Sequence, residues 1–208
     1  MSLLERVEMV LAGPDPAPIV QVGHPVLRAR AARCRGQLDP VMLGELVELM
    51  RRTMHAAPGV GLAAPQIGIP LALAVIEDPG ALDPEIAAVR DRAPLPFRVL
   101  VNPEYEPVGT ERVSHYEGCL SLPGWQAVVA RYREVRLTGQ DETGRPLDET
   151  VTGWPARIVQ HETDHLHGIL YIDRAELRSI AADEGVGAVL GTEPSPTTAA
   201  RVLGFDLA

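Results

Sequence analysis

The sequence predicts an α+β fold, and three observations support this class. Two segments have the apolar spacing of helices, several others have the composition of short strands, and hairpin-like turns join some of the strands. The 208 residues contain no internal repeat, and this length corresponds to one or two domains. We divide the chain into a flexible N-terminal arm (1–18), a single domain (19–178) and a weakly ordered C-terminal tail (179–208).

The first elements follow from local signals. Residues 1–18 end in the run Gly13–Pro18, which is rich in glycine and proline and indicates a poorly ordered arm. Asp39 and Pro40 then form the start of a helix, with Asp39 as the N-cap. Its apolar face follows helical spacing and consists of Leu43, Leu46, Val47, Met50 and Met54. The helix should end before Pro58.

Strand-like segments occupy the middle of the chain. They are Leu71–Glu77, Phe97–Asn102, Glu111–Tyr116, Val128–Leu137 and Pro146–Val151. Asp78–Pro96 contains four prolines and several charges, so we expect a surface loop there. Pro155–His167 has the features of a second helix, which should end at Gly168.

Composition excludes several function classes. The chain has 19 basic and 28 acidic residues, and its net charge of −9 argues against nucleic-acid binding or attraction to an anionic membrane. All the basic residues are arginines, so mechanisms that need a catalytic or phosphate-binding lysine are excluded. The N-terminus lacks the pattern of a signal peptide. The uncharged stretch Thr53–Ile76 contains too many prolines and glycines for a membrane span, so we expect a soluble, cytoplasmic protein.

The strongest local signal for chemistry is His161-Glu162-Thr163-Asp164-His165. On a helix the two histidines lie one turn apart and can bind the same metal ion, with Glu162 placed to act as a base. Helical phase puts both histidines and Glu162 on the apolar face, where unpaired polar groups are costly. The opposite face carries Arg157, Gln160, Asp164 and His167. The sequence therefore predicts a metal site.

A catalytic zinc-like site uses three protein ligands and one open position. Downstream, the position of a third histidine in related proteases is occupied by Tyr171, although Glu176 or Glu184 could serve. Upstream, Cys119 lies beside a glycine in Glu117–Ser121 and would complete a His₂Cys site. Taken alone, a free cysteine is more often a small buried apolar residue.

The segment Gly59–Gly68 contains a match to the dinucleotide-binding pattern G-x-G-x-x-A. A helix precedes it instead of a strand, and Pro65 prevents a helix from starting there, so nucleotide binding is not expected. The glycines and Gln66 instead suit close approach of a substrate backbone and hydrogen bonding to a carbonyl oxygen.

Three motifs together, Gly59–Gln66 (G-x-G-L-A-A-x-Q), Glu117–Ser121 (E-G-C-L-S) and His161–His165 (H-E-x-x-H), resemble the peptide deformylase family. They occur in the family's order, and the resemblance covers roughly residues 19–175. It implies antiparallel strands wrapped around a central helix that carries the two histidines. It also implies removal of formate from the N-terminal formyl-methionine of new polypeptides.

The resemblance further implies roles for individual residues. Cys119, His161 and His165 would bind the metal, and Glu162 would transfer the proton. The Gln66 side chain and the Leu120 backbone N–H would stabilise the oxyanion. Gly61 would admit an extended substrate, and Asp164 would have Arg131 as its partner. The methionine pocket would be formed by Val60, Trp154 and Ile158, although core packing explains these three equally well.

The family's usual metal is Fe(II), with Zn, Ni or Co as substitutes, and the ligand types alone do not choose among them. Some members contact the ribosome through a basic C-terminal helix. The resemblance therefore allows a transient ribosome contact, but the tail here contains Asp183, Glu184, Glu193 and Asp206 against Arg201, which does not favour docking through the tail. Two alternatives remain at this stage: a zinc metalloprotease with a downstream third ligand, and a non-catalytic metal-binding module.

Overall fold

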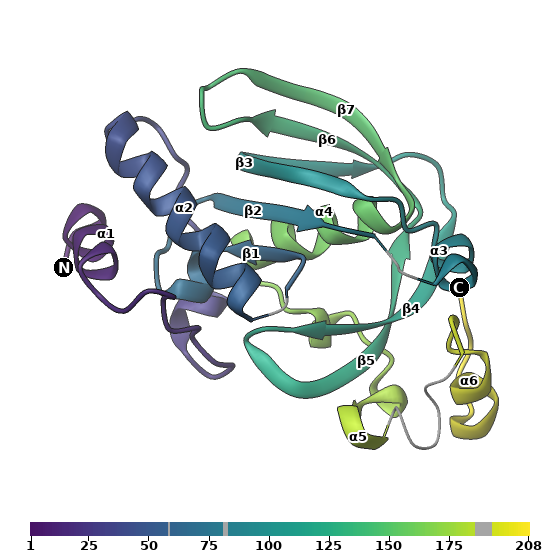
Figure 1. The fold of residues 1–208 in the computed structure, drawn as a ribbon. Coiled ribbons are helices and arrows are strands. Elements are labelled where there is room, and N and C mark those ends of the chain that lie inside the picture. The colour runs from purple at the N-terminus through teal and green to yellow at the C-terminus, as the bar shows by residue number, and fades with distance from the viewer. Residues whose placement is uncertain (58, 81–82, 186–192) are drawn as a thin grey trace.

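The computed structural model describes residues 1–57, 59–80, 83–185 and 193–208, and its strands form two antiparallel sheets (Figure 1). The larger sheet contains, in spatial order, β1 (Gly61–Ala63), β2 (Leu73–Asp78), β3 (Leu95–Pro107), β6 (Glu134–Gln140) and β7 (Pro146–Thr152). The smaller sheet contains β4 (Arg112–Cys119), β5 (Leu122–Tyr132) and β8 (Ala181–Ala182). The predicted α+β class is confirmed.

The helices pack with these sheets. They are α1 (Leu3–Leu11), α2 (Pro40–Ala56), α3 (Pro84–Arg90), α4 (Gly153–Leu166), α5 (Asp183–Gly185) and α6 (Thr197–Leu203). Single 3₁₀ turns occupy Pro25–Arg28, Ala64–Ile67, Tyr171–Asp173 and Leu177–Ser179. Within the described ranges, no helix has both the length and the apolar character needed to cross a membrane.

The larger sheet is covered on both faces. Successive side chains of a strand point to opposite faces, so Leu73 and Val75 of β2 pack with α1 and α2, whereas Ala74 and Ile76 pack with α4. This two-sided burial explains the unbroken apolar sequence of β2. Helix α4 contacts strands of both sheets and therefore occupies the centre of the fold (Figure 1).

The start of α2 was predicted correctly. The Asp39 side chain accepts hydrogen bonds from the backbone N–H groups of Val41 and Met42, each at 2.9 Å. These bonds satisfy two of the N–H groups that a helix start leaves free. The helix ends at Ala56, before Pro58 as predicted, and Pro58 itself lies outside the described residues.

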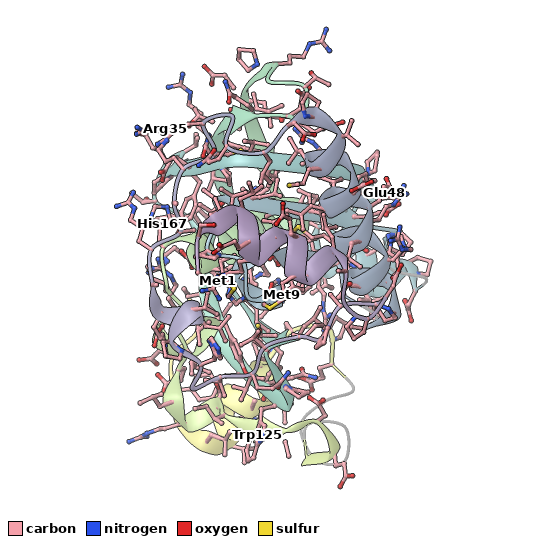
Figure 2. The ribbon with its side chains drawn as sticks, turned by 90° about the vertical axis from the view of Figure 1, so that its left-hand side faces the viewer. Met1, Met9, Arg35, Glu48, Trp125 and His167 are labelled. Atoms are coloured by element: carbon pink, nitrogen blue, oxygen red, sulfur yellow. The ribbon has the colours of Figure 1, made fainter. Side chains whose placement is uncertain are left out.

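The prediction of a poorly ordered arm at residues 1–18 was wrong for its first part. Ser2 and Glu5 form a reciprocal capping box that starts α1, and Val7 is fully buried in the core. Figure 2 looks onto this corner, where α1, labelled at Met1 and Met9, lies against α2. The glycine and proline run that suggested disorder begins only after the helix has ended.

Two other irregular regions also contain structure. The predicted loop Asp78–Pro96 includes α3, which Asp83 caps, although residues 81–82 lie outside the description. The predicted weakly ordered tail includes β8 and α6, whose Ala199 and Ala200 are buried, and residues 186–192 lie outside the description. Tertiary packing, which local composition does not report, organises the tail, whereas α3 begins with the same local Asp-Pro signal as α2.

The predicted strand Val128–Leu137 is two strands in different sheets. At Arg133 the backbone N–H donates to the Glu111 carbonyl beside β4, while the Arg133 carbonyl accepts from Gly153 at the start of α4. The two backbone groups of one residue thus bond in different directions. The chain leaves the smaller sheet after Tyr132 and enters the larger one at Glu134.

The predicted helix Pro155–His167 corresponds to α4, and Gly168 follows it with a left-handed φ of 74°. Its polar face is buried as well as its apolar face, since Arg157, Gln160 and Asp164 are all buried. Each has protein partners, which offset the cost of removing polar groups from water.

Candidate active site

A pocket of about 480 Å³ opens where α4, β1 and the smaller sheet meet. All but one of the predicted site residues line it: Val60, Gly61, Gln66, Cys119, Leu120, Trp154, Ile158, His161 and Glu162. The exception, His165, does not line the pocket, but its Nε2 lies 3.3 Å from Cys119 Sγ. The fold therefore brings three separate sequence motifs to one place.

Cys119, His161 and His165 each present one metal-ligating atom, and these three atoms lie within 4.8 Å of one another. The two histidines occupy successive turns of α4, and Cys119 ends β4. One sulfur and two nitrogen donors, with the pocket on the remaining side, match a catalytic metal site with an open position. Glu162 Oε2 is buried without a hydrogen-bond partner beside them, as expected if water or substrate is to bind there. The residues present fit a divalent metal ion.

Glu117 orients the ring of His161. Its Oε2 lies 3.1 Å from His161 Nδ1, so the other ring nitrogen is available to the cluster. Arg131 donates two hydrogen bonds to Glu117, both at 2.9 Å, and Arg157 donates a further one. Burial alone would raise the pKa of Glu117, but the two guanidinium groups hold this pKa well below its usual range. Glu117 is therefore an anion that orients a candidate ligand.

The two histidines differ electrostatically. Burial lowers the pKa of His165 well below its usual value, which leaves a neutral imidazole of the kind that binds metals. Burial also opposes a charge on His161, yet contacts with Cys119 and Glu117 raise its pKa well above the usual value. A metal ion bound by His161 would take the place of that proton.

Glu162 is buried against β1. Burial raises its pKa to about 7, against the opposing effects of His161 and Arg131. A Cβ atom on Gly61 would lie only 2.3 Å from Glu162 Oε1, so a larger residue at this position would displace the carboxylate. The position of Glu162 in the third motif thus explains why the first motif has a glycine at Gly61.

Gln66 is fixed by hydrogen bonds at both ends of its amide. Its Oε1 accepts from the Ala63 backbone N–H at 2.8 Å, which turns Nε2 toward the pocket. Nε2 lies 3.6 Å from Cys119 Sγ and 3.3 Å from Ser121 Oγ. The side chain therefore presents a donor, and not an acceptor, beside the cluster.

Asp164 has the partner that the sequence analysis expected. Arg131 Nη1 donates to its Oδ2, and Arg174 donates to the same carboxylate at 2.7 and 2.9 Å. Arg131 also donates to Glu117, so one buried guanidinium contacts both Asp164 on α4 and the carboxylate that orients His161.

A family model described as polypeptide deformylase matches residues 16–180. The chain belongs to the peptide deformylase family. Deformylases remove the formyl group from the N-terminus of nascent polypeptides, and this chain is a hydrolase of that kind.

Relatives cover nearly the whole chain. Peptide deformylase 3 of Streptomyces avermitilis is 60% identical over 205 residues, which is 99% of this chain and 91% of that protein. The peptide deformylase of Bifidobacterium adolescentis is 51% identical over 190 residues, or 91% of this chain and 87% of that protein.

Among solved structures, a class I type b deformylase from Acinetobacter baumannii gives a TM-score of 0.69 at 33% identity, covering 76% of this chain and 98% of that one. A deformylase from Synechococcus elongatus, solved in complex with actinonin, gives 0.65 at 33% identity, covering 93% of this chain and 89% of that one.

Some features of the deformylase site were not foreseen. The roles of Glu117 and Arg157 depend on contacts between distant segments, although Glu117 lies within a recognised motif. Asp183 lines the pocket because β8 pairs with β5, and nothing in the local sequence indicates this. Glu176, considered as a metal ligand, instead accepts a hydrogen bond from the Arg178 backbone and lies outside the three-residue cluster. Glu184, the other downstream candidate, also lies outside this cluster.

Proposed function

We propose that Cys119, His161 and His165 hold one divalent metal ion, and that Glu162 transfers the proton during hydrolysis of the formyl amide of formyl-methionyl peptides. The observation that carries this is the convergence of the three donor atoms beside Glu162 in the pocket. A bound divalent ion acts as a Lewis acid and can lower the pKa of water from about 15.7 to about 7.

The side chains then have separate tasks. The Glu162 carboxylate takes a proton from the water that attacks the formyl carbon, and later gives it to the amine as the carbon–nitrogen bond breaks. The Gln66 amide and the Leu120 N–H donate to the formyl oxygen as it gains negative charge. The fixed orientation of Gln66 supports this assignment.

The same pocket accounts for substrate binding. Val60, Trp154 and Ile158 supply apolar surface for the methionine side chain, and Gly61 lets an extended peptide backbone approach Glu162. The substrates are nascent chains, so we place the enzyme in the cytoplasm, where such chains are made.

We propose Fe(II) as the native ion, with Zn, Ni or Co able to replace it. The resemblance to deformylases favours Fe(II), since imidazole and thiolate ligands suit all of these ions. Metal analysis of protein purified without oxygen tests this directly. Iron in near-stoichiometric amount is expected, and zinc in its place would contradict the assignment.

The first experiment measures formate release from a short formyl-methionyl peptide, with protein supplied with Fe(II) or Ni(II) without oxygen. Formate should appear while the internal peptide bonds remain intact. Cys119→Ala should lose metal, whereas a metalloprotease with a downstream ligand would keep it. Glu162→Gln should keep the metal and lose activity, and an unchanged rate would indicate a non-catalytic role for the site.

A further inference from the structure

A second cavity, of about 230 Å³, lies on the far side of Trp154 from the catalytic pocket. Trp154 and Arg157 line both spaces, so the indole acts as a partition between them. The other walls come from the end of α3 and from β4 and β5. This region adjoins the C-terminus, since the Ala208 N–H donates to Ser114 in β4 (Figure 1).

Two buried nitrogen atoms in the cavity wall lack partners. His115 Nδ1 and Trp154 Nε1 have no hydrogen-bond partner among the described residues, and the two rings lie 5.8 Å apart. His115 is only 4% exposed. Leaving a buried polar group without a partner costs about 1–3 kcal/mol, so two such groups beside one cavity indicate that the cavity holds something that accepts hydrogen bonds.

Four arginines also line the cavity: Arg90, Arg131, Arg133 and Arg157. Arg131 pairs with Glu117 and Asp164, Arg157 pairs with Glu117, and Arg133 pairs with Asp91 and Glu111. Arg90 differs from these three. Its Nε donates to the Pro194 carbonyl at 3.0 Å, but it forms no ion pair within the described part of the chain. Among the arginines that line the cavity, Arg90 is therefore the one whose charge has no carboxylate partner among the described residues.

The arginines keep His115 uncharged. Burial, together with the nearby charges of Arg157 and Arg90, lowers the pKa of His115 to about 4. The Pro194 backbone also contacts the His115 ring, but its carbonyl already accepts from Arg90 Nε, so the neutral imidazole can carry its single proton on Nδ1 and donate it there. The wall then offers one guanidinium and two neutral N–H groups, with the Arg90 guanidinium 5.3 Å from the centre of the Trp154 ring.

We propose that this cavity is a binding site for a small monocarboxylate anion, held by Arg90, His115 and Trp154. A single negative charge matches the one lining guanidinium that has no ion pair among the described residues, and the two oxygens of a carboxylate provide enough lone pairs for three donors. Formate, which the enzyme's own reaction releases, belongs to this class. The site lies behind the catalytic pocket and uses donors that the reaction does not need.

The chain allows a direct binding measurement because it contains only two tryptophans. In a Trp125→Phe background, Trp154 is the only source of indole fluorescence. The protein is titrated with sodium formate, sodium acetate, sodium phosphate and sodium chloride at matched ionic strength. We expect a saturable change with the two carboxylates and none with chloride.

Variants assign the response to this cavity. Arg90→Gln and His115→Phe should each weaken carboxylate binding at least tenfold. Arg112→Gln is the matched control, because Arg112 also lies over an aromatic ring, that of Tyr132, but does not line the cavity. Near-ultraviolet circular dichroism checks that each variant is folded. If one of the two fails to fold, the other still tests the site.

Three results would overturn the proposal. Absence of a saturable carboxylate response would mean that the cavity holds only water. A response unchanged by Arg90→Gln would place the anion elsewhere, for example in the catalytic pocket, which Arg90 does not line. Tighter binding of phosphate than of formate and acetate would exclude a site for monocarboxylates.

Discussion

Glu117 shows how one buried residue connects stability with chemistry. Its carboxylate contacts Arg131, Arg157 and His161, which come from two different elements. Burying a charge is costly unless it is paired, and here the pairing also fixes the orientation of a candidate metal ligand. A substitution at this position should therefore affect folding and metal affinity together.

Gln66 provides a test of oxyanion stabilisation at the level of one side chain. Gln66→Leu should keep its metal, because Gln66 is not a ligand, but should lower kcat by about 10²–10³. Formate release and metal content are measured on the same preparation. Gln140→Leu, at an exposed position at the end of β6, is the control. An unchanged kcat in Gln66→Leu would remove this residue from the mechanism.

Gly61 tests the tight contact between the first and third motifs. Because the added Cβ of Gly61→Ala would overlap the Glu162 carboxylate, we expect a fall in kcat of at least about tenfold with the metal retained. The control is Gly44→Ala, where a Cβ meets no atom within 4 Å. Equal rates in the two variants would show that Glu162 tolerates displacement.

At the residue scale, the sequence predicted which residues gather at the pocket because the chemistry is concentrated in three short motifs. It could not predict what supports them. A single sequence shows that Arg131 and Arg157 exist, but not that both point at Glu117. The position of Asp183 likewise depends on the pairing of Ala181 and Ala182 with β5.

At the scale of elements, helices with clear caps were predicted best. Asp39 marks the start of α2 in the sequence and in the structure. The capping box at Ser2 and Glu5 carries an equally local signal, which the nearby prolines obscured. The change of sheet at Arg133 was not predictable, because the apolar pattern continues across it and only the distant partners Glu111 and Gly153 define it.

Helix α2 also contains a position that can be improved. Gly44 is exposed in the helix interior, where glycine costs about 0.5–1 kcal/mol relative to alanine. Gly44→Ala should therefore increase the free energy of unfolding by about that amount, without altering activity. Urea denaturation measures the change. A decrease would contradict the expectation that the added methyl group is accommodated in open space on this face of α2.

At the scale of the whole molecule, α4 at the centre of the fold explains why its polar face is buried. The chain surrounds this helix, so Arg157, Gln160 and Asp164 meet protein instead of water. The periodicity of the helix correctly separated its two faces. It could not show that the second face is also covered, because satisfied buried polar residues and exposed ones look alike in a sequence.

The buried His115 should make folding sensitive to pH. Its pKa is about 4 in the folded protein and ordinarily 6.5, so between these values the unfolded chain binds a proton that the folded chain does not. Stability should thus fall as pH decreases from about 6.5 to about 4, by at most roughly 3 kcal/mol, and this contribution should level off below that range.

His115→Phe tests this contribution. The difference in unfolding free energy between this variant and the parent should grow in favour of the variant as pH falls, and comparing the two cancels effects common to both. Gln140→Leu, which replaces an exposed side chain that does not titrate, should show no such trend. A pH-independent difference for His115→Phe would contradict the explanation.

The C-terminal segment has a consequence for an enzyme that meets unfolded chains. Along the outer edge of β5, Val129 bridges Ala175, Val128 bonds to Glu176 and Ser179, and Trp125 and Gln126 pair with β8. An open strand edge pairs readily with any extended backbone. With this edge occupied by its own chain, β5 is closed to pairing with the emerging polypeptides that the enzyme processes and with other copies of the protein.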